Sequence, residues 1–280
     1  MNKSIKIGGA SGFWGDSVIA TPQLLNGNKL DFIVYDYLAE ITMSIMARAR
    51  AKDSTKGYAV DFVSSVLKLN LKQIANQKIK ILSNAGGVNP VACAEAIREL
   101  VKELNLDLNV SVVLGDDLID KKDQFSKLQI KEMYSNDLFP QEEKIASINA
   151  YLGAFPIAKA LSEGADIVIT GRSVDSAVTL GACIYTFGWN ENDYDKLAAG
   201  SLAGHIIECG TQSTGGNFTD WELVSKDLHE IGYPLVEVSD NGSFVCTKSK
   251  DSAGMVSFGT VAEQMLYEIG DPQAYILPDV

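Results

Sequence analysis

Short apolar runs alternate with helical stretches along most of this chain. The runs lie at residues 4–7, 30–35, 79–82, 108–114 and 165–170, and helical spacing of apolar residues occurs between them, at 38–50, 90–104 and 145–161. Strands that are apolar throughout and alternate with helices are typical of a parallel sheet covered on both faces. The sequence therefore predicts an α/β fold with a mostly parallel, doubly wound, Rossmann-like sheet.

The region after about residue 190 has a different texture. Helical spacing returns at 197–208 and 259–269, while two β-rich runs at 235–238 and 243–247 flank Asp240-Asn241-Gly242. Asn-Gly between two such runs is a strong signal for a β-hairpin. We expect an α/β ligand-binding core over residues 1–190, and a smaller α+β extension over 191–280 that contains the hairpin, completes the site and docks a partner.

The breaks after the predicted strands are rich in Gly, Asn, Asp and Arg. They comprise residues 8–16, Asp36 with Glu40, residues 84–89, Asp116 with Asp117, and residues 171–175. Open parallel sheets bind ligands at the carboxyl ends of their strands. The central prediction is that these polar breaks meet around one cleft.

The net charge of −12 opposes nucleic acid as a partner, because phosphates would be repelled. No apolar run is long enough to span a membrane, and the first residues lack the apolar stretch of a signal peptide. Cys93, Cys183, Cys209 and Cys246 are far apart without a CxxC pair, which favours reduced thiols over a disulfide framework or zinc knuckle. We expect a cytoplasmic protein.

The break after the first strand, GGASGFWGDS at residues 8–17, favours a binding role. Glycines let the backbone approach a ligand and expose N–H groups to an anion, so Gly9, Ser11, Gly12 and Asp16 are predicted to bind substrate. The loop lacks the G-x-G-x-x-G fingerprint and the chain has no G-K-[ST] phosphate loop, which makes nucleotide binding the weaker interpretation. A tight strand-to-helix turn is the alternative.

Asp36 and Glu40 are candidate catalytic residues. They lie one helical turn apart, so both side chains can face the same sheet edge. Two neighbouring carboxylates can separate their pKa values and act as general base and general acid, or hold a metal. The alternative for Asp36 is that it caps the helix that follows.

Asn84, Gly86, Gly87 and Asn89 follow the third predicted strand. Their side chains and N–H groups, at the start of a helix, could hold a carbonyl or carboxylate oxygen of a substrate. The same residue types are common in ordinary turns, which is the alternative explanation.

Arg172 and Asp175 follow the fifth predicted strand. Arg172 is a candidate anion clamp, and Asp175 is predicted to orient it or to cap the next helix. A purely structural Arg–Asp pair is the competing account.

His205 and Glu208 share one face of the helix predicted at 197–208. This spacing suits a proton relay or two metal ligands, and we count both residues among the catalytic candidates. A structural role is the alternative for an isolated histidine, and nothing in the sequence indicates a lowered pKa for the thiol of Cys209.

Together these segments resemble the acyclic terpene utilisation family, in its AtuA-like N-terminal domain. The resemblance covers essentially the whole chain and rests on GGASGFWGD at 8–16, DYLAE at 36–40, TM at 42–43, GYAVDF at 57–62, NAGGVNP at 84–90, TGR at 170–172 with Asp175, HIIECG at 205–210, TGGN at 214–217 and YEIGDP at 267–272.

The resemblance implies an enzyme that degrades acyclic terpenoids or branched carboxylic acids as coenzyme A thioesters. Hydratase- or lyase-type acid/base chemistry on a carboxylate or thioester is the expected activity. The residue roles follow from the crowding of polar breaks at one sheet edge and not from the resemblance. Asp36 or Glu40 would give or take one proton, and His205 with Glu208 would form the second acid/base pair. The thioester oxygen or a carboxylate would be held by Asn84, Gly86, Gly87 and Arg172. No cofactor is predicted beyond coenzyme A as part of the substrate, and a divalent metal stays open.

Typical members of the family continue past the Pro-Asp-Val segment at which this sequence stops. We therefore expect a homo-oligomer, or a hetero-oligomer with a small downstream subunit. The alternative function follows from the same feature: a non-catalytic binding or scaffolding subunit whose partner supplies the missing domain.

Overall fold

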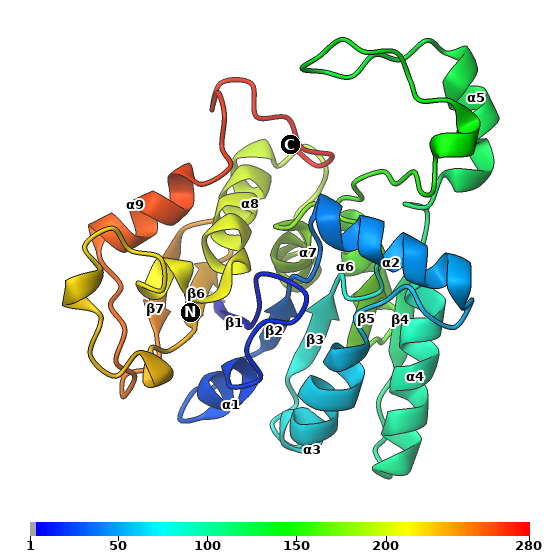
Figure 1. Ribbon diagram of the computed structural model, residues 1–280. Coiled ribbons are helices and arrows are strands. Elements are labelled where there is room, and N and C mark those ends of the chain that lie inside the picture. The colour runs from blue at the N-terminus through cyan, green and yellow to red at the C-terminus, as the bar shows by residue number, and fades with distance from the viewer. Residues whose placement is uncertain (1–3) are drawn as a thin grey trace.

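A seven-stranded sheet forms the centre of the computed structural model, which describes residues 4–280 (Figure 1). The strand order is β4-β5-β3-β2-β1-β6-β7. The strands are β1 (Ser4–Gly9), β2 (Phe32–Tyr35), β3 (Lys80–Ser83), β4 (Val110–Val113), β5 (Ile167–Thr170), β6 (Pro234–Ser239) and β7 (Phe244–Lys248). Strands β1 to β5 are parallel, β6 is antiparallel to β1, and β7 is antiparallel to β6. This confirms the predicted α/β class.

Helices cover both faces of the sheet, as right-handed crossovers require. From β1 to β3 the chain advances in one direction across the sheet, and one apolar core joins that face to its helices. They are α1 (Ala20–Leu25), α2 (Glu40–Lys52), the π-helix η1 (Phe62–Leu67), α3 (Lys68–Asn76) and α4 (Pro90–Glu103).

The second core lies on the opposite face, because the chain turns back from β4 to β5. Its helices are α6 (Phe155–Ser162), α7 (Ala177–Phe187), α8 (Tyr194–Glu208) and α9 (Phe258–Leu266). Alternate residues of β2 separate between the two cores, Ile33 and Tyr35 into the first, Phe32 and Val34 into the second. The sheet is therefore apolar on both faces, as the continuous apolar runs predicted.

The C-terminal hairpin is confirmed at β6 and β7. Its first strand pairs with β1 from Ser4 opposite Ser239 to Gly8 opposite Leu235, so the hairpin extends the same sheet. The connections contain short 3-10 helices, η2 (Ile119–Lys121), η3 (Glu142–Lys144), η4 (Gly210–Thr214), η5 (Trp221–Leu223) and η6 (Leu228–Glu230).

The prediction of a helix over 145–161 is wrong in its first half. Helix α6 begins only at Phe155, with Pro156 in its first turn. Before it, the Ala150 N–H donates to the Asp116 carbonyl (2.8 Å) and the Leu152 N–H to the Arg172 carbonyl (3.2 Å). Hydrogen bonds to distant segments thus hold this stretch extended, beside the loops that follow β4 and β5.

An arm, residues 118–147, projects from the body of the protein (Figure 1). It contains α5 (Lys122–Lys127), and Phe125 stacks on Phe139 with 6.3 Å between ring centroids. Across residues 4–280, no helix combines the length and the apolar character needed to cross a membrane.

Candidate functional site

Asp36 and Asn84 meet where neighbouring parallel strands β2 and β3 end. The Asn84 Nδ2 donates to Asp36 Oδ1 (2.6 Å), and the Tyr37 N–H donates to Asn84 Oδ1 (2.8 Å). The Leu38 N–H also donates to Asp36 Oδ1 (3.1 Å). Both side chains are buried, so the Asn84 amide fixes the position of the Asp36 carboxyl.

Arg172, directly after β5, connects this pair to the loops around it. Its guanidinium binds Asp175 (2.6 Å) and the Leu38 carbonyl (3.0 Å), and it lies 3.5 Å from Glu40 Oε1. The guanidinium carbon lies 4.4 Å from the centre of the Tyr151 ring, whose hydroxyl donates to Glu40. As arranged, Arg172 points its donors at protein acceptors and positions the acidic groups.

Helix α8 brings His205 and Glu208 to the same sheet edge. Close packing there depends on two glycines: a Cβ on Gly9 would collide with the Ile207 carbonyl, and one on Gly12 would lie 2.8 Å from the Cys209 Cα. His205 Nδ1 lies 2.8 Å from Glu208 Oε1, with both side chains buried. The missing side chains of Gly9 and Gly12 therefore make room for the end of α8.

Three carboxyl groups converge in this arrangement. One oxygen each of Asp36, Asp175 and Glu208 lies within 4.8 Å of the others. Burial and the neighbouring carboxylates raise the pKa of Asp36 well above its usual range, and burial raises the pKa of Asp175 although Arg172 opposes the shift. Burial raises the pKa of Glu208 to about 7, against the opposing effect of His205. In all three groups burial favours the protonated form, and Glu208 titrates near neutral pH.

The surroundings of His205 favour its protonated form. Burial lowers the pKa of His205, but the hydrogen bond and charge of Glu208 outweigh it, and the net shift is upward. Backbone carbonyls of Gln264 and Met265 in α9 add to the upward shift. The imidazole ring thus lies between the Glu208 carboxyl group and carbonyl groups at the end of α9.

Glu40 has a different environment from the other predicted acid. Its side chain is 79% exposed, and the hydrogen bond from Tyr151, together with the charge of Arg172, keeps the pKa of Glu40 below its usual value. Asp36 and Glu40, proposed as a pair from their spacing, therefore titrate in opposite directions. The contacts with Tyr151 and Arg172 favour the ionised form of Glu40, whereas burial favours the protonated form of Asp36.

Carboxylate oxygens at this spacing suit Mg²⁺ or Mn²⁺ as well as shared protons. Asp36, Asp175 and Glu208 are the residues that could hold such an ion. The sequence offers Asp36 with Glu40, or His205 with Glu208, as possible metal ligands. It does not bring Asp36, Asp175 and Glu208 together, because these three residues lie on three different segments.

A cavity of about 310 Å³ opens beside the cluster. Asp175, His205 and Glu208 form part of its wall together with Glu268. The remaining wall is largely apolar and includes Val174, Ala198, Leu202, Ile269, Leu277 and Val280. An apolar space that ends at titratable groups is typical of a small-molecule site.

The other predicted binding residues have contacts within the protein. The Ser11 hydroxyl donates to the Asp36 carbonyl (2.9 Å), and Asp16 accepts from the Gly12 N–H (2.9 Å). Ser11 and Gly12 therefore border the cluster, while Asp16 closes the loop after β1. Their predicted role in substrate binding stays a prediction.

The predicted binding residues in the loop after β3 also make contacts within the protein. A Cβ on Gly86 would collide with the Thr170 carbonyl, and Gly87 has a φ of +54° and packs against Met46. Asn89 begins α4 and its amide donates to the carbonyls of Ser54 and Lys56 (2.9 Å each). The described contacts of Asn89 thus lie with α4 and the loop after α2, away from the acidic cluster.

Tyr151 and Asp116 are site residues that the sequence analysis does not select. Asp116 is buried and accepts from the Arg172 N–H (2.8 Å) and the Asn149 amide (2.9 Å). The sequence places Asp116 at the correct sheet edge but gives it no role. Tyr151 is missed because the sequence predicts a helix around it, whereas the structure holds it in an extended stretch with its ring against Arg172.

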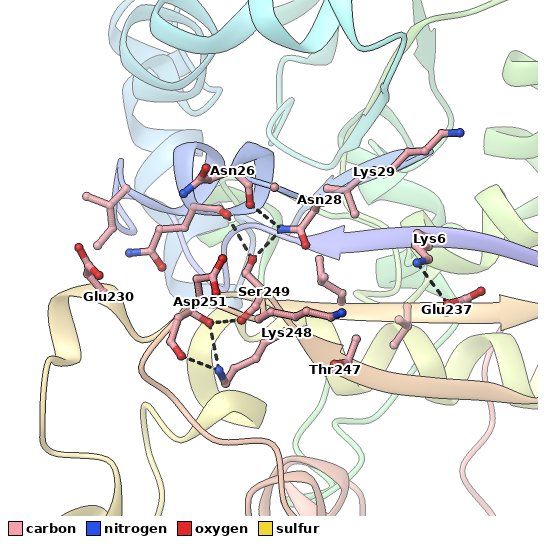
Figure 2. Close-up of a pocket in the computed structure, with 18 of the residues that line it drawn as sticks. Lys6, Asn26, Asn28, Lys29, Glu230, Glu237, Thr247, Lys248, Ser249 and Asp251 are labelled. Carbon is pink, nitrogen blue, oxygen red and sulfur yellow. Dashed lines mark hydrogen bonds and ion pairs between the residues drawn. The ribbon is translucent and has the colours of Figure 1, made fainter.

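A second cavity, of about 540 Å³, lies between the loop after α1 and the strands β6 and β7, beside Lys6 of β1 (Figure 2). Its polar groups are largely engaged with one another. Lys6 pairs with Glu237 (3.4 Å), and the Lys248 ammonium donates to the Ser252 carbonyl (2.7 Å). None of the predicted catalytic or binding residues lines it. The cavity beside Glu208 is therefore the candidate active site.

Comparison with known proteins agrees with this assignment at the level of family. The family model described as acyclic terpene utilisation family protein AtuA matches residues 5–280. No curated protein and no solved structure matches the chain. The matched range includes every residue of the acidic cluster. The chain therefore belongs to the acyclic terpene utilisation family, AtuA.

Proposed function

We propose that this protein is an enzyme of acyclic terpenoid or branched-acid catabolism that performs hydratase- or lyase-type acid/base chemistry on an acyl thioester. One observation carries the proposal. Asp175 and Glu208, two carboxyl groups with raised pKa, lie at the wall of a largely apolar cavity. General acid/base catalysis is most effective when the pKa of the catalytic group lies near the working pH.

The two cavity-facing carboxyls can divide the chemistry between them. In the dehydration direction, Glu208 as carboxylate takes the proton from the carbon next to the thioester carbonyl. The electron pair of that C–H bond forms the double bond, and the hydroxyl on the next carbon leaves as water with a proton from Asp175. One proton is gained and one lost by the enzyme, and hydration is the reverse. Asp36, behind them, exchanges protons with the pair.

The charge of the cavity favours a neutral reacting group. Asp175, Glu208 and Glu268 line it, whereas His205, the basic residue of its wall, is already paired with Glu208. Arg172 is likewise occupied by Asp175 and Glu40. A free carboxylate would be repelled here, so a thioester is the better substrate of the two classes considered.

The test is turnover of branched 3-hydroxyacyl- and 2-enoyl-CoA by the purified chain, followed by ultraviolet absorbance and by the mass of water added or lost. Glu208→Gln keeps the size of the side chain and removes its titration. Because a general acid/base contributes about 10²–10⁴-fold, kcat/KM should fall by at least about 100-fold.

Glu95→Gln is the matched control, since Glu95 is exposed on α4. It should retain the activity of the unmodified protein. Equal activity of Glu208→Gln and Glu95→Gln would remove Glu208 from the mechanism, and absence of turnover with every thioester would refute the proposed activity.

The arm favours a second candidate function, a non-catalytic subunit that docks a partner. Four large apolar side chains on it are exposed, Leu128 (65%), Met133 (79%), Tyr134 (85%) and Leu138 (70%). Exposed apolar clusters of this kind mark interaction surfaces. Turnover by the isolated chain argues against this candidate, and turnover only after addition of a purified partner supports it.

A further inference from the structure

Residues 268–280, here called the C-terminal segment, form one wall of the candidate active-site cavity. The lining residues Ile269, Pro272, Tyr275, Leu277 and Val280 all belong to it. The segment follows α9 and passes near the end of α8 (Figure 1). It contains no helix or strand, so its position depends on the contacts that it makes with the body.

Asp279 makes the most specific of these contacts. The Ala154 N–H, at the start of α6, donates to Asp279 Oδ2 (2.8 Å), and the Phe155 N–H also bonds the carboxyl. These are backbone donors that a helix leaves without a partner in its first turn. Burial raises the pKa of Asp279, and the two N–H donors oppose that rise.

Gly153 provides the space for this contact. A Cβ at position 153 would collide with the Asp279 carboxyl, so only glycine leaves the notch open. Beside the notch, Val280 packs against the second apolar core. The notch thus holds the Asp279 carboxyl in a single position.

The remaining described backbone hydrogen bonds of the C-terminal segment lie within it. The Ala274 N–H donates to the Asp271 carbonyl (3.0 Å) and the Leu277 N–H to the Val280 carbonyl (2.8 Å). They shape the segment but do not attach it to the body. Its far end is therefore fixed by Asp279 and the packing of Val280, and its near end by α9.

We propose that Asp279, seated in the Gly153 notch, is the positioning residue that holds the C-terminal segment over the cavity and so sets its selectivity for long, branched acyl chains. The inference rests on the proposed function, because it assigns the cavity to the acyl chain. Asp279 itself touches no reacting atom. When its carboxyl leaves the notch, the wall formed by Tyr275 and Leu277 is released, and the contacts of a long chain are lost.

Three variants distinguish loss of the hydrogen bond in the notch from loss of the Asp279 side chain itself. Asp279→Ala removes the acceptor, Gly153→Ala fills the notch and leaves Asp279 intact, and Asp279→Asn keeps an acceptor oxygen for the Ala154 N–H. Two neutral probes are compared by titration calorimetry, the N-acetylcysteamine thioesters of 3,7-dimethyloctanoic acid and of butyric acid. Hydrogen exchange of residues 268–280 is measured in parallel.

Asp279→Ala and Gly153→Ala should weaken binding of the long thioester by about tenfold or more, as expected for loss of a hydrogen bond to a charged group. Binding of the short thioester should change by less than about twofold, and exchange should accelerate in residues 268–280. Asp279→Asn should restore most of the selectivity.

Unchanged exchange and an unchanged ratio of the two affinities in Asp279→Ala and Gly153→Ala would overturn the proposal, as would an equal loss for both probes. These readouts need no turnover. A protein that binds the long thioester selectively but converts no substrate would refute the proposed activity and leave the role of Asp279 intact.

Discussion

Replacement of Glu208 by glutamine should raise the unfolding free energy relative to the unmodified protein as the pH rises. The pKa of Glu208 is raised from 4.5 to about 7 by burial and by the neighbouring carboxylates. A group whose pKa is higher in the folded state stabilises the fold below its unfolded pKa, and this contribution is lost as the pH rises through the folded value. The unmodified protein should therefore lose stability between about pH 4.5 and pH 7.

The size of the effect follows from the shift. The interval from 4.5 to about 7 corresponds to about 3 kcal/mol of unfolding free energy, the charged form being disfavoured by that amount. A glutamine amide does not titrate, so Glu208→Gln should gain about 3 kcal/mol relative to the unmodified protein on going from about pH 4 to about pH 8. For a chain of 280 residues this is about 5 °C in Tm.

Thermal denaturation at both pH values, with Glu95→Gln as control, measures this difference. Glu95→Gln should change the Tm by the same amount at both. A difference between Glu208→Gln and the unmodified protein that does not change with pH would show that Glu208 ionises normally, and the acid/base assignment would lose its basis.

Three further predictions concern the supports of the site. Arg172→Met should lower the unfolding free energy by roughly 3 kcal/mol at about pH 7 and by less at about pH 5, because Asp175 loses its buried countercharge; urea denaturation at both pH values checks this, and an equal loss would contradict it. Gly9→Ala should cost roughly 2 kcal/mol or more because its Cβ would meet the Ile207 carbonyl, whereas Gly270→Ala, with no atom near its Cβ, should change Tm little. Tyr151→Phe should raise the pKa of Glu40 towards its usual value, measured by NMR titration of its carboxyl, and an unmoved pKa would remove Tyr151 as the cause.

The polar residues of the sheet edge can be predicted from the sequence, because parallel strands bring their carboxyl ends together. Asp36, Asn84 and Arg172 each follow an apolar run closely, and the structure places them in one electrostatically linked group. The close packing of the end of α8 against this edge cannot be predicted from the sequence. It depends on Gly9 and Gly12, whose lack of a side chain is equally typical of a ligand loop, and only the tertiary packing shows that it admits a helix end.

The remaining site residues lie in segments without periodicity. Tyr151 lies in a stretch that is held extended by hydrogen bonds to the loops after β4 and β5. The spacing of the apolar residues around it is nevertheless typical of a helix. Asp279 and the C-terminal segment have no periodic pattern at all, since their position is fixed by a notch at Gly153. Local spacing therefore predicts the strands and their ends, but not the segments that close the cavity.

Hydrogen isotope exchange at the substrate tests the central claim most directly. A branched 2-enoyl thioester is incubated with the protein in D₂O near neutral pH, and deuterium on the carbon next to the carbonyl of the hydrated product is measured by mass spectrometry. The account predicts incorporation with the unmodified protein and with Glu95→Gln, and none above background with Glu208→Gln. Equal incorporation in Glu208→Gln, or none in any of the three, would contradict it.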